Sequence, residues 1–304
     1  MLNKYMNLAL ITIIKLFSRM GFRVLYILSD FLFFWVYRVF GYRRSVVRSN
    51  LMRSFPEKTS GELKKIEKQY FRHLCDVMLE SLKTGGMDAE EMQKRMLIRN
   101  PEMVNRYLDK GTSVVIMAMH YANWEWLLHM PLAIRHRQFF VYKPLHNEML
   151  DDYLNGLRGR FGGETVPMSI ALRKVIEADK SGEPVMTWLA ADQAPPWFNS
   201  FWTIFLNQET QFFEGPARIA QRFNHPILFQ LIRKNKRGYY ETWFELLTEE
   251  PQKMSEEEII LAYVARTEQF IQDSPAYYIW SHKRWKHLRP SDIPLRTRDR
   301  QDAS

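Results

Sequence analysis

Short uncharged runs and amphipathic segments alternate along the middle of the chain. The cleanest uncharged run covers residues 113–119 and ends abruptly at His120, as expected of a buried strand in a parallel sheet. Further strands are predicted at residues 138–142, 164–167 and 185–191, with helices between them at residues 147–161 and 170–180. Strands that alternate with helices in this way predict βαβ units, and hence an α/β fold with a mostly parallel central sheet flanked by helices.

The clearest amphipathic helix is predicted at residues 62–82, where apolar side chains recur at steps of three and four. Thr59 and Glu62 fit a capping box at its start. A second such helix is predicted at residues 256–272. We expect the apolar stripes of both helices to pack against the core.

Two segments of the second half have other patterns. Residues 226–232 and 239–247 flank a basic turn and predict an antiparallel hairpin. Residues 194–215 hold many aromatic side chains without a period. That stretch predicts either a lid or wall around an apolar ligand or a buried irregular loop.

Residues 5–40 are apolar and aromatic, but charged side chains interrupt them. The cleanest apolar part, residues 24–37, is shorter than the roughly 20 residues that a membrane-spanning helix needs. Basic residues flank it on both sides, which suits helices lying in an anionic membrane interface. We therefore expect a membrane anchor of the monotopic kind at residues 1–45, a main domain at residues 46–290 and a flexible tail at residues 291–304. A short or tilted span is the alternative for the anchor.

Composition restricts the classes of partner and site. The 304 residues, 46% of them hydrophobic, suffice for one sizeable core. A net charge of +9 indicates an anionic partner, which could be a membrane surface, an acidic carrier protein, a phosphorylated substrate or nucleic acid. The single cysteine, Cys75, excludes a disulfide framework and a cysteine-based zinc site. The chain also lacks the His-Glu-x-x-His segment of zinc hydrolases, so no metal site is expected.

The candidate chemistry lies at His120, because the carboxyl edge of an open α/β sheet is where such folds bind ligands. Asn123 is placed to cap a following helix, with Glu125 in its first turn. On one continuous helix His120 and Glu125 would lie about 140° apart, so they can meet only if the chain bends between them. A strand, a bend and a capped helix supply that bend. The pair would then be an imidazole held by a carboxylate, as in a general base for acyl transfer.

The spacing of His120 and Glu125 is not distinctive in itself. The same interval separates a histidine from a carboxylate at His146 and Asp151 and at His287 and Asp292. Only His120 follows an uncharged strand and precedes a capped turn. A core histidine with a satisfied ring is the alternative interpretation.

Several stretches, in one order along the chain, resemble motifs of a single family. They are His-Tyr-Ala-Asn-Trp-Glu at residues 120–125, Tyr142-Lys143-Pro144, Leu157-Arg158-Gly159-Arg160-Phe161-Gly162, Asp192-Gln193, Phe212-Phe213-Glu214-Gly215-Pro216-Ala217 and Trp280-Ser281-His282-Lys283-Arg284-Trp285-Lys286. Together they resemble the late acyltransferases of lipid A biosynthesis, relatives of the wider glycerolipid acyltransferases. The likeness runs from about residue 24 to about residue 290.

The resemblance implies a membrane-associated O-acyltransferase of lipopolysaccharide synthesis, on the cytoplasmic face of the bacterial inner membrane. It would move a fatty acyl chain from an acyl thioester to a hydroxyl of a lipid A precursor or related glycolipid. Acyl carrier protein or coenzyme A would carry the acyl chain as co-substrate, and no other cofactor is expected. His120, oriented by Glu125, would take the proton of the acceptor hydroxyl, and no acyl-enzyme is required.

The resemblance also implies substrate-binding residues near this pair. Its candidates are Asn123, Lys143, Arg158, Arg160, Asp192 and Gln193. The Asn123 amide, or backbone N–H groups at the helix start, would stabilise the oxyanion. The three basic residues would grip a phosphate or a glycan carboxylate, although each arginine could instead be a solvated surface charge. Asp192 and Gln193 would shape the same site or form only a turn or cap.

The sequence is also compatible with other functions. The acceptor could be a lysophospholipid or an aminolipid, because the same scaffold serves several lipids. A non-catalytic membrane-surface protein that binds lipid would use the positive charge only for attachment. Nucleic-acid binding rests on the charge and interleaved aromatics alone, and no recognised fold signature supports it.

Overall fold

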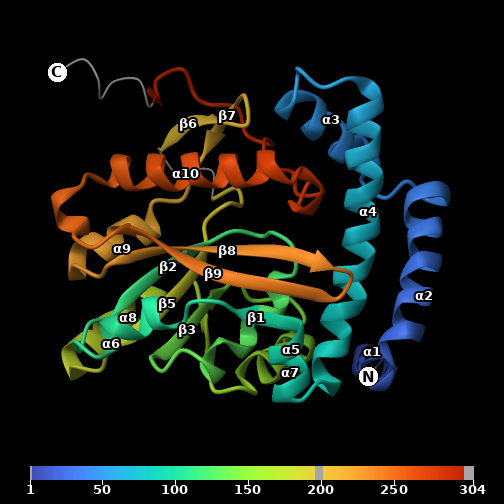
Figure 1. Cartoon of the computed structure of the whole chain (residues 1–304), viewed down its shortest axis with the longest axis horizontal. Helices are drawn as coiled ribbons and strands as arrows, with labels where there is room; N and C mark the ends of the chain where they lie inside the picture. The colour runs from blue at the N-terminus through green and yellow to red at the C-terminus, as the bar shows by residue number, and fades with distance from the viewer. Residues whose placement is uncertain (1, 196–200, 298–304) are drawn as a thin grey trace.

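A seven-stranded sheet forms the centre of the computed structural model, which describes residues 2–195 and 201–297 (Figure 1). In spatial order its strands are β1 (Met96–Ile98), β9 (Tyr239–Thr248), β8 (Ile227–Lys236), β2 (Val114–Ala118), β5 (Val185–Ala190), β3 (Arg137–Tyr142) and β4 (Glu164–Pro167). All neighbouring strands are parallel except β8 and β9, which form the expected antiparallel hairpin. The predicted mostly parallel α/β sheet is therefore confirmed.

Strand β2 lies in the middle of the sheet, between β8 and β5. Every residue of β2 is at most 1% exposed, which explains why the strand carries no polar side chain. The helices that follow or flank the strands are α5 (Ala89–Arg95), α6 (Glu102–Leu108), α7 (Glu148–Gly159), α8 (Ala171–Ser181), α9 (Gly215–Phe223) and α10 (Glu256–Asp273). Tyr263 of α10 donates a hydrogen bond to the carbonyl oxygen of Ala118 at the end of β2, at 2.7 Å.

Helix α4 (Ser60–Lys83) is the longest helix of the described chain and stands along one side of the sheet, beside the β8–β9 turn (Figure 1). It begins with the predicted capping box, in which Thr59 accepts from the Glu62 N–H and the Glu62 side chain accepts from the Thr59 N–H. Helices α1 (Leu2–Arg19) and α2 (Phe22–Phe33) both contact α4. The described carboxylates on its buried face include Glu67, Asp76 and Glu80, which an amphipathic pattern does not predict.

The aromatic stretch at residues 194–215 is regular in its described part, which corrects the expected irregular loop, while a lid or wall around an apolar ligand stays a prediction. In the described part, β6 (Trp202–Phe205) and β7 (Gln208–Gln211) form a regular hairpin, which β10 (Leu295–Arg296) extends to three strands. Leu206 and Asn207 form its turn with φ of 51° and 62°. Because leucine is an unusual residue for a left-handed turn position, these two residues do not predict a hairpin turn. Residues 196–200 lie outside the described part of the chain.

The amino-terminal helices leave large apolar side chains in contact with solvent. They continue beyond α2 as a π-helix, η1 (Phe34–Val39), and as α3 (Arg44–Ser54). Within residues 2–195 and 201–297, no individual helix has both the length and the hydropathy of a membrane span. Residues Phe22–Val39 and Arg44–Ser54 meet these criteria only as a pair, and they are bent by 83° at the break between them.

Candidate active site

His120 and Asp192 lie side by side at the carboxyl edge of the sheet. Parallel strands β2 and β5 are in register, with Ala118 opposite Ala190, so the residues that follow each strand also come together. The His120 Nδ1 atom is 2.7 Å from Asp192 Oδ1, and the His120 backbone N–H donates to Asp192 Oδ2 at 2.9 Å. One carboxylate therefore fixes both the ring and the backbone of the histidine.

Glu125 does not hold the His120 ring, which corrects the expected pairing. Its Oε1 accepts from the Trp124 indole N–H at 3.1 Å, and its Oε2 lies 3.6 Å from Arg158 Nη2. The predicted bend exists, but it places Glu125 at the start of the 3₁₀ helix η3 (Trp124–Leu132), beside α7. The neighbouring strand end, and not the bend, supplies the carboxylate that orients His120.

The bend itself is made at Ala122, which has φ of 49°. A residue with a Cβ in this left-handed region costs about 1–2 kcal/mol, so the surrounding structure has to hold it there. The Ala122 N–H donates to the Tyr277 carbonyl oxygen at 3.0 Å, and Tyr121 pairs with Tyr278 in an isolated antiparallel bridge. The segment after β2 is thus fastened to the carboxyl-terminal part of the chain.

Opposing effects set the protonation of the pair. The His120 side chain is 20% exposed, and that of Asp192 is completely buried. Burial acts most strongly on His120 and lowers its pKa, but the charge and hydrogen bond of Asp192, together with the charge of Glu125, outweigh it and raise the pKa above 6.5. Burial likewise raises the pKa of Asp192, whereas His120 and Arg284 lower it more, so Asp192 is ionised at neutral pH.

Arg284 is a part of this environment that the sequence did not identify. Arg284 is 3% exposed, although it lies near the carboxyl end among aromatic and basic residues. It donates to the Gln211 carbonyl oxygen at 2.6 Å and lies over the Phe212 ring at 4.5 Å. Because its charge lowers the pKa of Asp192, we interpret it as the buried counter-charge of the pair. The alternation of aromatic and basic residues around it gave no sign of burial.

Asn123 caps η3 as predicted, since its Oδ1 accepts from the Trp126 N–H at 3.2 Å. Its Nδ2 donates to Glu80 Oε2 at 2.7 Å, and the residue is completely buried. The amide is therefore occupied at both ends, which corrects the expectation that it contacts substrate. Glu80 is a further residue that the sequence did not identify, because its helix reads as ordinary core packing.

The expected basic residues are placed in different ways. Arg158 is half-buried between Glu125 and the Tyr142 ring, 5.7 Å from that ring, so it belongs to the site. Arg160 donates to the Thr84 carbonyl oxygen at 2.8 Å, which ties the end of α7 to that of α4. Lys143 is exposed just after β3.

Gln193 is half-buried directly after Asp192, at the end of β5. Behind Trp124 lies a small, mainly apolar hollow, whose lining also includes Leu74, Val77, Tyr277 and Ile279 but neither His120 nor Asp192. The Trp124 ring packs edge-on against the His120 ring with a centroid distance of 5.4 Å. An imidazole, basic side chains and an apolar wall therefore meet at one edge of the sheet.

Comparisons with known proteins identify the family of the chain. The chain matches the family described as bacterial lipid A biosynthesis acyltransferase over residues 1–287. It is 23% identical over 246 residues to the lipid A biosynthesis palmitoleoyltransferase of Escherichia coli (strain K12), covering 80% of this chain and 79% of that protein. The lipid A biosynthesis acyltransferase of Shigella flexneri matches with the same identity and coverage.

Among solved structures, the chain has a likeness to the 1-acyl-sn-glycerophosphate (LPA) acyltransferase PlsC from Thermotoga maritima. The TM-score is 0.36 and the identity 13%, over 84% of this chain and 98% of that one. The family match, which extends over nearly the whole chain, shows what kind of protein this is. The chain belongs to the bacterial lipid A biosynthesis acyltransferase family and is an acyltransferase.

Proposed function

We propose that this acyltransferase moves a fatty acyl chain from an acyl thioester to a hydroxyl of a lipid A precursor or related glycolipid at a membrane surface. The observation that supports the proposal is the His120 imidazole, held through Nδ1 by the buried Asp192 carboxylate. Acyl carrier protein or coenzyme A carries the acyl chain, and the proposed reaction uses no other cofactor.

In the proposed step His120 is the general base. Asp192 accepts the hydrogen bond from Nδ1–H, so Nε2 keeps a lone pair for the proton of the acceptor hydroxyl. The hydroxyl oxygen attacks the thioester carbonyl carbon, an ester bond forms and the carbon–sulfur bond breaks. The leaving thiolate then takes the proton from the imidazolium, which returns the histidine to its starting state.

In this proposal Glu125 stabilises the positive charge that forms on His120, and Arg158 binds negative charge on the acceptor. The Glu125 carboxylate raises the pKa of His120 and so stabilises the imidazolium that forms during transfer. Arg158, with the exposed Lys143, binds phosphate groups of the acceptor, for which a guanidinium is well suited. Backbone N–H groups at the start of η3 are the proposed oxyanion donors, because the Asn123 side chain is occupied.

The amino-terminal helices are the proposed membrane contact. Large apolar side chains of α1, α2 and η1, and of Phe40 directly after η1, are exposed to a degree unusual in a soluble protein; those in the helices include Leu8, Leu16, Ile27, Phe31, Phe34 and Val39. Basic residues lie in the same stretch, as in helices that rest on anionic lipid. We propose that these helices seat the enzyme on the cytoplasmic face of the inner membrane, where the lipid acceptor is available.

Replacing the proposed base tests the reaction directly. His120→Gln should lower acyl transfer from acyl carrier protein to a lipid A precursor in membranes by about 10²–10⁴-fold, because the acceptor hydroxyl keeps its proton. His146→Gln is the matched control, since His146 has the same spacing to a carboxylate but is exposed in a loop. Wild-type rates in a folded His120→Gln protein would contradict the proposed mechanism.

Mass spectrometry of lipids from cells lacking the enzyme would identify the acceptor.

The pH profile distinguishes the two carboxylates near His120. The base must be neutral, so the acid limb of kcat/KM should lie above pH 6.5 in the wild type. Asp192→Asn and Glu125→Gln each remove a charge that raises the pKa of His120, and both should move this limb to lower pH. Asp192→Asn should move it further and also lower the plateau by about 10²–10⁴-fold, because the ring loses its orienting partner. A larger displacement in Glu125→Gln would assign the orienting role to Glu125.

Membrane attachment is testable without activity. Combined replacement of Ile27, Phe31 and Phe34 by serine should weaken binding to vesicles of anionic phospholipid by about tenfold or more, because buried apolar surface is lost. Leu288→Ser is the matched control, since Leu288 is 92% exposed but lies in the carboxyl-terminal segment. Unchanged binding of the triple variant, measured by vesicle co-sedimentation, would contradict the proposed contact.

A further inference from the structure

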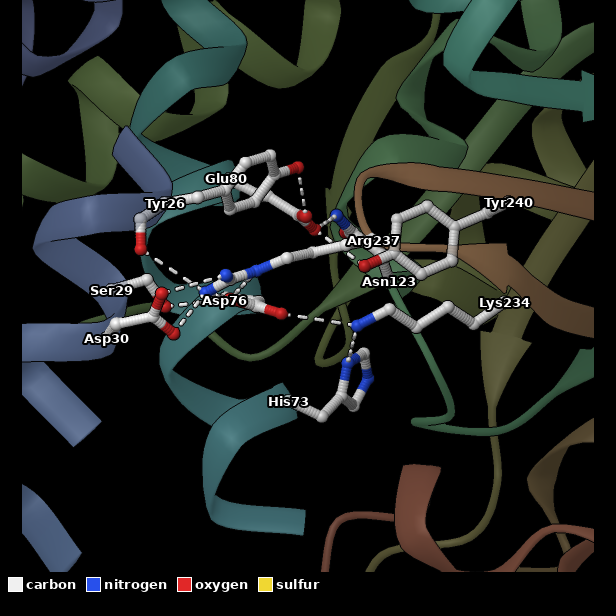
Figure 2. A network of polar contacts seen from close by, with 10 residues as sticks. All are labelled: Tyr26, Ser29, Asp30, His73, Asp76, Glu80, Asn123, Lys234, Arg237 and Tyr240. Atoms are coloured by element: carbon white, nitrogen blue, oxygen red, sulfur yellow. Dashed lines mark hydrogen bonds and ion pairs between the residues drawn. The ribbon is translucent and has the colours of Figure 1, made fainter. Parts of the chain in front are cut away.

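A buried carboxylate on α4 lies directly behind the active-site segment. Glu80 has no exposed surface, and three different elements each contribute one donor to it (Figure 2). Tyr26 of α2 donates to Oε1 at 2.8 Å, while Tyr240 of β9 and the Asn123 amide both donate to Oε2 at 2.7 Å. The carboxylate thus joins the amino-terminal helices, the sheet and the segment that carries His120.

The direction of the bond to Asn123 is fixed by its surroundings. The Asn123 Oδ1 accepts from the Trp126 N–H, so the group facing Glu80 must be the amide N–H₂ donor. Glu80 also accepts from the Trp126 indole N–H through its backbone carbonyl oxygen, at 3.1 Å. One residue of α4 therefore fastens the first turn of η3 at two points.

The segment between His120 and Glu125 needs such anchors, because it turns through the left-handed Ala122. Asp192 holds its first residue, and contacts with Tyr277 and Tyr278 hold its middle. At the far end, Glu80 holds Asn123. The cap to Trp126 is the other side-chain hydrogen bond of Asn123 in the described part of the chain, so the bond to Glu80 is half of its side-chain anchoring.

A carboxylate at position 80 is not the choice that would best stabilise the folded protein. Burial raises the pKa of Glu80, and its partners are neutral donors, with Lys234 acting only through its charge. The cationic side chains of the neighbouring hairpin, Lys234 and Arg237, instead pair with Asp76, one turn earlier on α4 (Figure 2). A buried ionisable group without a direct counter-ion is costly, so a site that only needed packing would hold an apolar residue.

We propose that Glu80 is a positioning residue, which sets the geometry of the His120–Glu125 segment through Asn123 and ties that segment to α2 through Tyr26. Its consequence for catalysis rests on the function proposed above. The residue touches neither substrate nor the reacting atoms, so its removal acts through the placement of His120 and Glu125.

Exchanging the donor and the acceptor gives the sharpest test. Asn123→Asp keeps the cap to Trp126 but places two carboxylates against each other, so it should displace the segment. Glu80→Gln retains an acceptor for Asn123, and the Tyr26 hydroxyl can turn to accept from the new amide, so this variant should behave almost like the wild type. The double variant Glu80→Gln/Asn123→Asp reverses donor and acceptor and should restore the contact, with the Tyr240 hydroxyl turned to accept from the second N–H of the new amide.

Two readouts are needed in the full-length protein. In acyl transfer assays with membranes, Asn123→Asp should lower kcat about 10²-fold with little change in KM, and the double variant should recover most of that loss. In hydrogen exchange followed by mass spectrometry, amides of residues 120–126 should exchange faster in Asn123→Asp and return to wild-type rates in the double variant.

The matched control is Glu67→Ala. Glu67 is also a buried carboxylate of α4 and also accepts several hydrogen bonds, but these come from Arg44 and Arg48, away from the active site. This variant should lower the temperature of unfolding without faster exchange at residues 120–126. A change of the same size in that segment for Glu67→Ala would show that general destabilisation is sufficient, and would overturn the proposal.

The outcomes separate this inference from the proposed function. No recovery of either readout in a folded double variant, or an unaffected Asn123→Asp protein, would contradict the role of Glu80. Should the wild type transfer no acyl chain while exchange follows the expected order, the proposed function would fail and the positioning role of Glu80 would stand.

Discussion

The hydrogen bond between His120 and Asp192 is the interaction on which the site depends. It exists because β2 and β5 are adjacent, parallel and in register, so that two strand ends deliver an imidazole and a carboxylate to one point. Asp192 is completely buried, but the charges of His120 and Arg284 lower its pKa, so it stays ionised at neutral pH. The sheet consequently orients the histidine through Asp192, while Glu80 holds the same segment three residues further on, at Asn123.

Much of this could be predicted from sequence because it depends on local patterns. The strand before His120, the capping box of α4, the cap at Asn123 and the β8–β9 hairpin each have a signature of a few residues. The spatial order of the strands has no such signature. Strand β5 pairs with both β2 and β3, although it follows β3 and β4 in the sequence. The sequence places Asp192 at a strand end near the site. Its contact with His120 could not be derived, because that contact requires β5 to lie beside β2.

The burial of charged side chains also could not be predicted from the sequence. Glu80 and Arg284 resemble surface residues in a sequence, because a helix stripe or an aromatic-basic tail does not show which polar side chains face inward. Their partners come from distant segments, such as Tyr26 and Tyr240 for Glu80 and Gln211 for Arg284. Helix α4 emerges as the element that connects the exposed apolar helices at one end of the chain with the active-site segment, and this connection is visible only in three dimensions (Figure 2).

The tautomer of His120 is the most direct measure of the central claim. Nitrogen-15 NMR of the full-length protein labelled at histidine, with a His120→Gln spectrum to assign the ring, reports which nitrogen carries the proton. We predict that neutral His120 has its proton on Nδ1, facing Asp192, and an unprotonated Nε2. A neutral ring protonated at Nε2 would leave no lone pair for the acceptor hydroxyl and would contradict the account.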